Sequence, residues 1–196
     1  YLDVLALGFL YYKGIKIMSE KYAKMYPDIK TYRLSNAKGE KGSLTINKDK
    51  VWYNAIINKE PLSVFPREEK YLLVNAREKY VKPSCSSAEH NHETTAINPL
   101  EALKNNSGAR GENFPARKYR LAVVCTGEYF AARGGNNNDV NAFIVSDVNG
   151  IQSIYENEMS VSFELLTPKI YNNANTDPFT NTDAGDDIDT NQQTIE

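Results

Sequence analysis

The sequence predicts two regions of different fold class, an α+β region rich in antiparallel strands over residues 1–80 and an α/β region over residues 118–196. Short runs of alternating apolar and polar residues, separated by turn residues, indicate the antiparallel strands of the first region. An apolar run, a stretch with apolar residues at helical spacing and a second alternating run indicate strand, long helix and strand in the second region. Residues 81–117 are predicted to be a flexible linker between them.

The first region is predicted to contain one helix and several strands. Ile15–Tyr26 carries apolar residues on a helical stripe, and Pro27 ends this helix because proline disfavours a helical conformation in the residue before it. Asn47–Lys50 is the predicted turn of a hairpin whose strands alternate in polarity. The predicted strands are Ile29–Leu34, Ser43–Ile46, Val51–Ile57 and Glu69–Asn75, with a turn over Asn36–Gly42.

The linker is recognised by its composition. Lys82–Ala116 contains few apolar residues, many Ser, Asn, Pro and Gly residues, and both histidines of the chain. A segment of this kind is expected to be exposed, and a protease would cut there.

The second region is predicted to form a βαβ unit. Tyr119–Thr126 (YRLAVVCT) is almost continuously apolar, which is typical of a strand buried on both faces. Gly134–Asn138 is a turn, Asp139 is a candidate cap, and apolar residues recur at helical spacing over Val140–Tyr155. Met159–Leu166 alternates as a second strand, so the sheet here is expected to be parallel in part.

Composition excludes several classes of protein. A net charge of −2 argues against binding to nucleic acid through phosphate contacts. No run reaches the roughly 18 apolar residues that span a bilayer. Leu2–Tyr12 is apolar, but it lacks a basic flank and a small-residue cleavage site, so a strand or buried helix start is favoured over a signal peptide. The chain begins with Tyr1, and we expect a signal peptide to lie upstream.

Several segments occur in the order and spacing of a known peptidase domain. They are Tyr119–Tyr129, Gly134-Gly135, Val148–Ile151, Ile154–Glu156, Met159–Leu166, Thr176–Thr180 and Asn191-Gln192. These segments resemble the opening of the catalytic domain of bacterial reprolysin-like metalloproteases (M12B-type), a branch of the metzincins. Lys21-Tyr22 followed by Tyr26–Tyr32 resembles the propeptide of the same family.

The resemblance implies a secreted, extracellular zinc endopeptidase made as a zymogen, with protein or peptide substrates and its own propeptide as inhibitor. Metzincins bind Zn²⁺ through His-Glu-x-x-His-x-x-Gly-x-x-His, whose glutamate activates the zinc-bound water. This motif is missing, because the only histidines of the chain are His90 and His92. We therefore expect that the chain stops before the zinc motif and that this fragment is inactive.

Three further sets of residues are candidate metal ligands. Many metzincin propeptides place a cysteine thiolate on the catalytic zinc, which makes Cys85 a candidate zinc ligand, although its flanks form no recognisable switch motif and an exposed thiol or a disulfide stays open. His90 and His92 could share one ion, but the spacing fits no structural zinc pattern, so a solvated linker is favoured. The oxygen ligands that suit Ca²⁺ are offered by Asp177, Asp183, Asp186 and Asp187, although an acidic solvated loop without an EF-hand pattern is the favoured interpretation.

The remaining candidate residues give weaker evidence of a function than those described above. Cys125 lies in a predicted buried strand, where cysteine is most simply a small apolar side chain. Nothing in the sequence brings Glu128 and Glu156 together as an acid and base, and Gly134-Gly135 lacks the lysine of a phosphate loop. Two alternatives stay open: a non-enzymatic exported binding or adhesion module, and, ranked last, a cytosolic enzyme with Cys125 as nucleophile, because no histidine is positioned to activate it.

Overall fold

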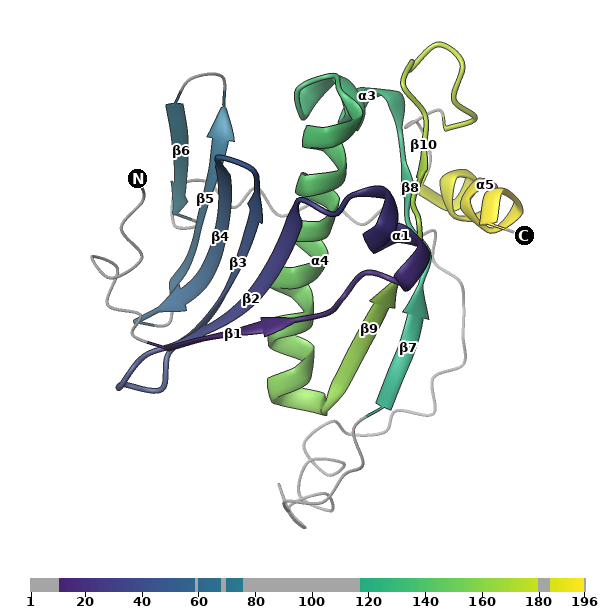
Figure 1. The fold of residues 1–196 in the computed structure, drawn as a ribbon. Coiled ribbons are helices and arrows are strands. Elements are labelled where there is room, and N and C mark those ends of the chain that lie inside the picture. The colour runs from purple at the N-terminus through teal and green to yellow at the C-terminus, as the bar shows by residue number, and fades with distance from the viewer. Residues whose placement is uncertain (1–10, 59, 68–69, 76–116, 180–183, 196) are drawn as a thin grey trace.

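A six-stranded antiparallel sheet lies on one side of a long helix in the computed structural model, which describes residues 11–58, 60–67, 70–75, 117–179 and 184–195. The sheet follows the order of the sequence from β1 to β6, and shorter parallel strands lie on the other side of the helix (Figure 1). This architecture is of the α+β class. The strands of the sheet are β1 (Tyr11–Ile15), β2 (Ile29–Ser35), β3 (Lys41–Asn47), β4 (Lys50–Ile57), β5 (Glu60–Arg67) and β6 (Lys70–Asn75).

Local sequence explains most of the antiparallel sheet. The predicted hairpin is confirmed: β3 and β4 pair antiparallel, with Leu44 opposite Tyr53, and Lys48 turns the chain with a positive φ of 56°. The strand predicted over residues 29–34 is β2, and the one predicted over residues 69–75 is β6. Strand β5 was not predicted, because Pro61 and Pro66 interrupt its pattern.

The helix predicted over Ile15–Tyr26 is wrong in its first half. Ile15 ends β1, and the chain stays extended to pair with a distant strand, since the Leu165 N–H donates to the Ile17 carbonyl at 2.7 Å. The helix α1 covers only Glu20–Met25, with Ser19 as its N-cap, and ends before Pro27 as predicted. Of the apolar segment Leu2–Tyr12, residues 1–10 lie outside the described residues.

The predicted βαβ unit is confirmed. Strand β7 (Arg117–Leu121) pairs parallel with β9 (Val161–Leu165), and the helix between them is α4 (Asn137–Met159). The remaining elements are β8 (Val124–Cys125), α3 (Gly127–Ala132), β10 (Lys169–Ile170) and α5 (Ala184–Ile195), of which β8 and β10 also pair parallel.

Two details of this unit differ from the prediction. Asn136, and not Asp139, is the N-cap of α4, because its side-chain oxygen accepts from the Asp139 N–H at 2.9 Å. The segment Tyr119–Thr126 is not buried on both faces. Tyr119 is 48% exposed, and the buried residue of the segment is Cys125.

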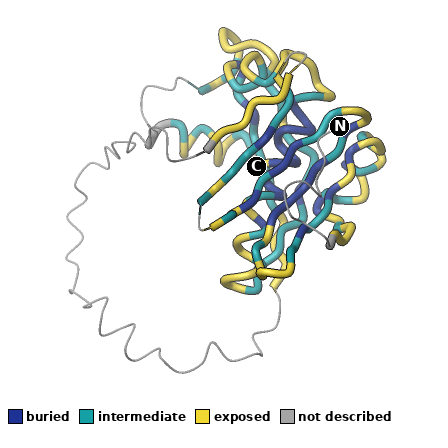
Figure 2. Tube along the Cα trace, turned by 90° about the vertical axis from the view of Figure 1, so that its left-hand side faces the viewer, coloured by how far each residue is buried: buried dark blue, intermediate teal, exposed yellow. Residues whose placement is uncertain are grey.

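One hydrophobic cluster joins the two predicted regions. Ile17, Tyr22 and Trp52 from the first region pack with Phe143 and Leu165 from the second, and the buried residues lie in the middle of the folded part (Figure 2). A second cluster, Leu34, Leu44, Tyr53, Ala55 and Val64, lies within the antiparallel sheet. The two regions therefore share a core, while the domain boundaries at residues 80 and 118 stay a prediction.

Candidate functional site

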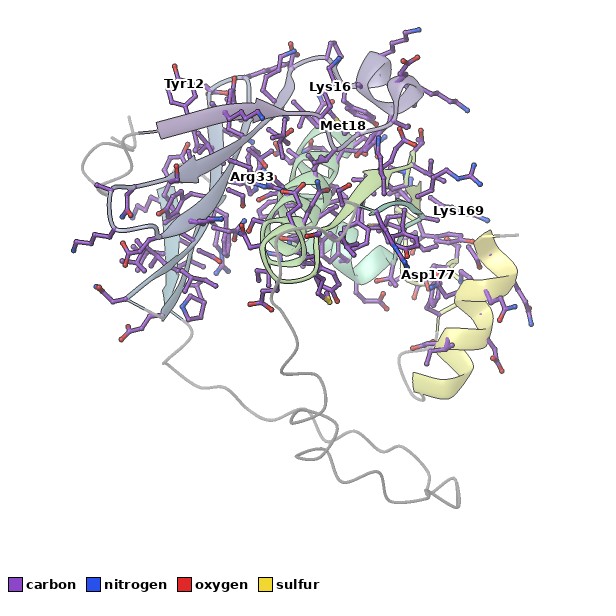
Figure 3. All side chains as sticks on the ribbon, turned by 90° about the horizontal axis from the view of Figure 1, so that it is seen from below. Tyr12, Lys16, Met18, Arg33, Lys169 and Asp177 are labelled. Carbon is purple, nitrogen blue, oxygen red and sulfur yellow. The ribbon has the colours of Figure 1, made fainter. Side chains whose placement is uncertain are left out.

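Helix α4 carries several polar side-chain contacts between the two regions. Arg33 points from β2 toward this helix (Figure 3), and its Nε donates to the Glu156 Oε2 at 2.8 Å. The same guanidinium donates to the Asn149 carbonyl at 3.1 Å and to the Asn149 side chain. Glu156 is therefore held in an ion pair, and it lies near the end of α4 opposite to α3, which carries the exposed Glu128. The structure does not bring these two carboxylates together.

Further hydrogen bonds fix α4 on the sheet. The Asn149 Nδ2 donates to the Leu44 carbonyl at 3.1 Å, and the Asn54 Nδ2 donates to the Ser146 hydroxyl at 3.2 Å. At the start of the helix, Lys50 forms an ion pair with Asp139 at 2.7 Å. These pairs satisfy polar groups that burial would otherwise penalise, so they position the helix and do not form a reactive group of side chains.

A second cluster of polar side chains lies where α3 meets α4. The Tyr129 hydroxyl donates to the Asp147 Oδ2 at 2.8 Å, and the Arg133 guanidinium lies over the ring of Phe143, 4.7 Å from its centroid. Desolvation by the surrounding protein raises the pKa of Asp147, against the hydrogen bond from Tyr129 and the charge of Arg133. Desolvation and the nearby Asp147 also raise the pKa of Tyr129. Tyr129 thus stays protonated and donates to Asp147.

The calcium candidates are divided by the structure. The Asp177 carboxylate (Figure 3) accepts from the Gly127 N–H at the start of α3 at 2.6 Å and from the Phe179 N–H at 2.9 Å, so each of its oxygens accepts from one backbone donor. Asp183 and the side chain of Asp186 lie outside the described residues, and Asp187 belongs to α5. The calcium role stays a prediction.

The cysteine and histidine candidates are placed as follows. Cys85, His90 and His92 lie outside the described residues. Cys125 is 3% exposed, and burial together with the negative charge of Asp177 raises the pKa of its thiol to about 11. A buried thiol of high pKa is a poor nucleophile, so the packing role of Cys125 is supported over the catalytic one.

The described residues do not fit a catalytic zinc centre. Such a centre needs three protein ligands. Within the described ranges, no three His, Cys, Asp or Glu side chains are grouped closely enough to hold a metal ion. Helices in the same ranges are also too short or too polar to span a membrane.

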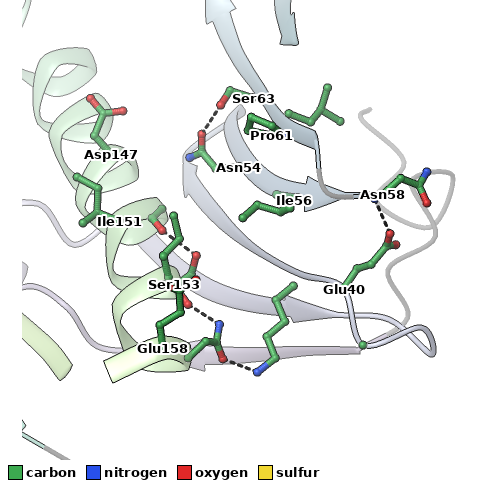
Figure 4. A pocket seen from close by; sticks show the side chains of 17 residues that line it. Glu40, Asn54, Ile56, Asn58, Pro61, Ser63, Asp147, Ile151, Ser153 and Glu158 are labelled. Carbon is green, nitrogen blue, oxygen red and sulfur yellow. Dashed lines mark hydrogen bonds between the residues drawn. The ribbon is translucent and has the colours of Figure 1, made fainter. Parts of the chain in front are cut away.

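A cavity of about 910 Å³ lies between α4 and the sheet (Figure 4). Ile151 of α4 faces it from one side and Ile56 of β4 faces it from the other, and Ile154 of α4 also lines it. Asp147 and Glu158 add negative charge. Sequence reasoning missed this cavity. The signal was present in α4, where Ile151 and Ile154 extend the apolar positions beyond what one buried stripe requires.

The fold and its contacts define an α+β protein in which a parallel strand–helix–strand unit is packed against an antiparallel sheet. Within this unit and the segments that follow it, residues 115–195 match the family model described as metallo-peptidase family M12 (Reprolysin_5). The match supports a reprolysin-like metalloprotease, a class of zinc-dependent hydrolases that act on proteins or peptides. No curated protein and no solved structure matched the chain.

Proposed function

We propose that this chain is the pro-region and the first part of the catalytic domain of a bacterial, secreted zinc metalloendopeptidase. The family match over residues 115–195 carries the proposal. The parallel pairing of β7 with β9 across α4 supports it, because strand, long helix and strand is the order that the resemblance implies for the opening of the domain.

In this proposal the zinc ligands come from residues after Glu196, and the 196-residue chain alone is inactive. Residues 1–80 act as the propeptide and residues 81–117 as the segment that is cut on activation. The contacts of Arg33 and Asn54 with α4 support a pro-region that packs on the catalytic part. Cys85 is the proposed thiolate ligand that keeps the uncut protein latent.

The test is made on the complete gene product. We expect a His-Glu-x-x-His sequence downstream of Glu196, cleavage of a peptide library by the full protein, and loss of cleavage when the glutamate of that motif is replaced by glutamine. The Cys85→Ala variant is expected to cleave before processing. A full-length protein without such a motif, or one whose cleavage survives the glutamine substitution, overturns the proposal.

A non-enzymatic exported binding module is the second candidate, and the apolar cavity beside α4 favours it. It predicts that the complete gene lacks the paired-histidine motif and that the chain binds a ligand without hydrolysing it. The downstream reading frame therefore separates the two candidates directly.

The Cys125 nucleophile is tested by its reactivity. Because the thiol pKa is about 11, roughly one thiol in a thousand is ionised at pH 8. In a Cys85→Ser background we expect slow labelling by iodoacetamide in the native state, and a rate that rises with pH up to about 11. Fast labelling at pH 7 that is lost only on denaturation would restore the catalytic interpretation.

A further inference from the structure

Three cavities lie next to one another along one flank of α4. The first, of about 910 Å³, and the second, of about 190 Å³, share Asn54, Ser63 and Asp147. The second and the third, of about 670 Å³, share Phe65, Arg133 and Phe143. Together they form one groove between α4 and strands β4–β6, here called the α4 groove.

Among the described residues, the α4 groove exists because α4 covers only part of a wide sheet. Helix α4 packs mainly on β3, with further contacts to β2 and β4. Five large apolar side chains that border the uncovered part are at least 36% exposed. They are Ile56, Leu72 and Val74 from the sheet, and Ile151 and Ile154 from α4. Apolar residues gathered in one groove, unlike scattered ones, mark an interaction surface.

Charge is distributed unequally along the α4 groove. The first cavity is lined by three carboxylates, Glu40, Asp147 and Glu158, against one lysine, Lys41. The third cavity is lined by Lys50, Arg67 and Arg133 against Asp139 alone, and Lys50 already pairs with that carboxylate. One end of the groove is therefore acidic and the other end is basic.

We propose that the α4 groove binds an amphipathic helix of a partner polypeptide. The partner's apolar side would cover Ile56, Ile151 and Ile154, with a basic residue at the acidic end and an acidic residue beside Arg67 and Arg133. A helix fits better than an extended segment because the groove is floored by a sheet face and walled by a helix, and a second helix beside the first completes such a layer. A strand would instead pair along a sheet edge, and Ile56, Ile151 and Ile154 lie on β4 and α4, away from the edge strand β6.

The span of the groove sets the length of the partner helix. The lining residues of α4 run from Asp139 to Glu158, which corresponds to about 28 Å at 1.5 Å per residue. A matching helix has about five turns, with apolar residues at positions i, i+3, i+4 and i+7. This proposal does not depend on peptidase activity, and it holds equally for a binding module.

The test uses fluorescently labelled synthetic helices of about 19 residues and the complete 196-residue chain. The three helices share one apolar face and carry Lys at one end and Glu at the other, Lys at both ends, or Glu at both ends. By fluorescence anisotropy we expect the helix with opposite end charges to bind about tenfold more tightly than either control helix, with an advantage that falls as salt is added.

Substitutions locate the binding on the protein. Ile154→Glu and Ile56→Glu are expected to weaken binding at least about tenfold, whereas Ile188→Glu, on α5 outside the groove and 68% exposed, leaves it unchanged. Circular dichroism checks that each variant is folded. Equal binding of the three helices, or binding that survives both groove substitutions, overturns the proposal. Self-association of the chain that Ile154→Glu abolishes also overturns it, because a second copy would then occupy the groove.

Discussion

The antiparallel sheet and the parallel strands meet the same helix but are built in opposite ways. Each strand from β1 to β6 pairs with its neighbour in the sequence. Strand β7 pairs with β9 only after the chain has passed through α3 and α4, with Arg117 opposite Val161. Yet α4 directs Asn149, Ser146 and Glu156 to the antiparallel sheet. The helix that closes the parallel unit thus finds several of its polar partners in the other region.

The largest effect is expected where the two regions share apolar contact. Phe143 of α4 contacts the ring of Trp52 at a centroid distance of 5.4 Å and that of Phe65 at 5.6 Å. Phe143→Ala should lower the free energy of unfolding by about 3–5 kcal/mol, because it leaves a cavity in the shared core. Denaturant unfolding followed by Trp52 fluorescence and by far-UV circular dichroism should give coincident transitions.

The exposed Met25 supplies the control for this experiment, since Met25→Ala is expected to change stability by less than about 0.5 kcal/mol. Two separate transitions, with the fluorescence of the only tryptophan preserved after helix is lost, would show that the two regions unfold independently. This outcome would contradict the conclusion that they share one core.

The polar contact of Arg33 with α4 should contribute less to stability than the apolar contact of Phe143, but it should be specific to its partners. Arg33→Met removes the ion pair to Glu156 and the donors to Asn149, and we expect a loss of about 1–3 kcal/mol. A double-mutant cycle with Glu156→Gln should give a coupling energy of at least about 0.5 kcal/mol. Lys118→Met with Glu164→Gln is the matched control, because that pair is longer, at 3.4 Å, and more exposed. Equal coupling in the two cycles would contradict the special role of Arg33.

A third change acts on the parallel region alone. Asp177→Ala leaves the Gly127 N–H at the start of α3 without its acceptor, and we expect a loss of about 1–2 kcal/mol. Thermal unfolding measures it, with Asp189→Ala on α5 as the control. Millimolar Ca²⁺ should leave the Tm of the unmodified chain unchanged. A rise in Tm with Ca²⁺ that Asp177→Ala abolishes would instead support the predicted calcium site.

Local pattern predicted much of the fold, and long-range pairing accounts for its errors. The hairpin of β3 and β4, helix α4 and strand β9 follow periodicities that adjacent residues specify. Ile15 and Ile17 suit a helical stripe as well as a strand, and only the distant Leu165 decides for the extended form. The helices α3 and α5 were not predicted, because neither carries a clear apolar stripe.

The sequence predicted the candidate sites less well than it predicted the fold. The pair of Arg33 and Glu156 joins residues that are 123 positions apart, and no local pattern reveals it. The α4 groove depends on how many strands one helix covers, which is a property of the packed layers. The missing zinc motif was visible at once, because an absent histidine pair needs no structure to be noticed.

The smallest effect tests how closely the two regions approach. Gly150 lies in α4, and a Cβ there would be 3.3 Å from the Asn54 Nδ2 of β4. Alanine favours the helix by about 1 kcal/mol, but the crowding against Asn54 opposes this gain, so Gly150→Ala should change stability by less than about 1 kcal/mol. In an Asn54→Ser background the same change should be more stabilising, because the crowding atoms are gone. Chemical denaturation of the four proteins measures both values. If alanine stabilises equally in both backgrounds, the Asn54 side chain moves away from the new Cβ at no cost. The hydrogen bonds of Asn54 would then hold α4 on the sheet less firmly than their geometry implies.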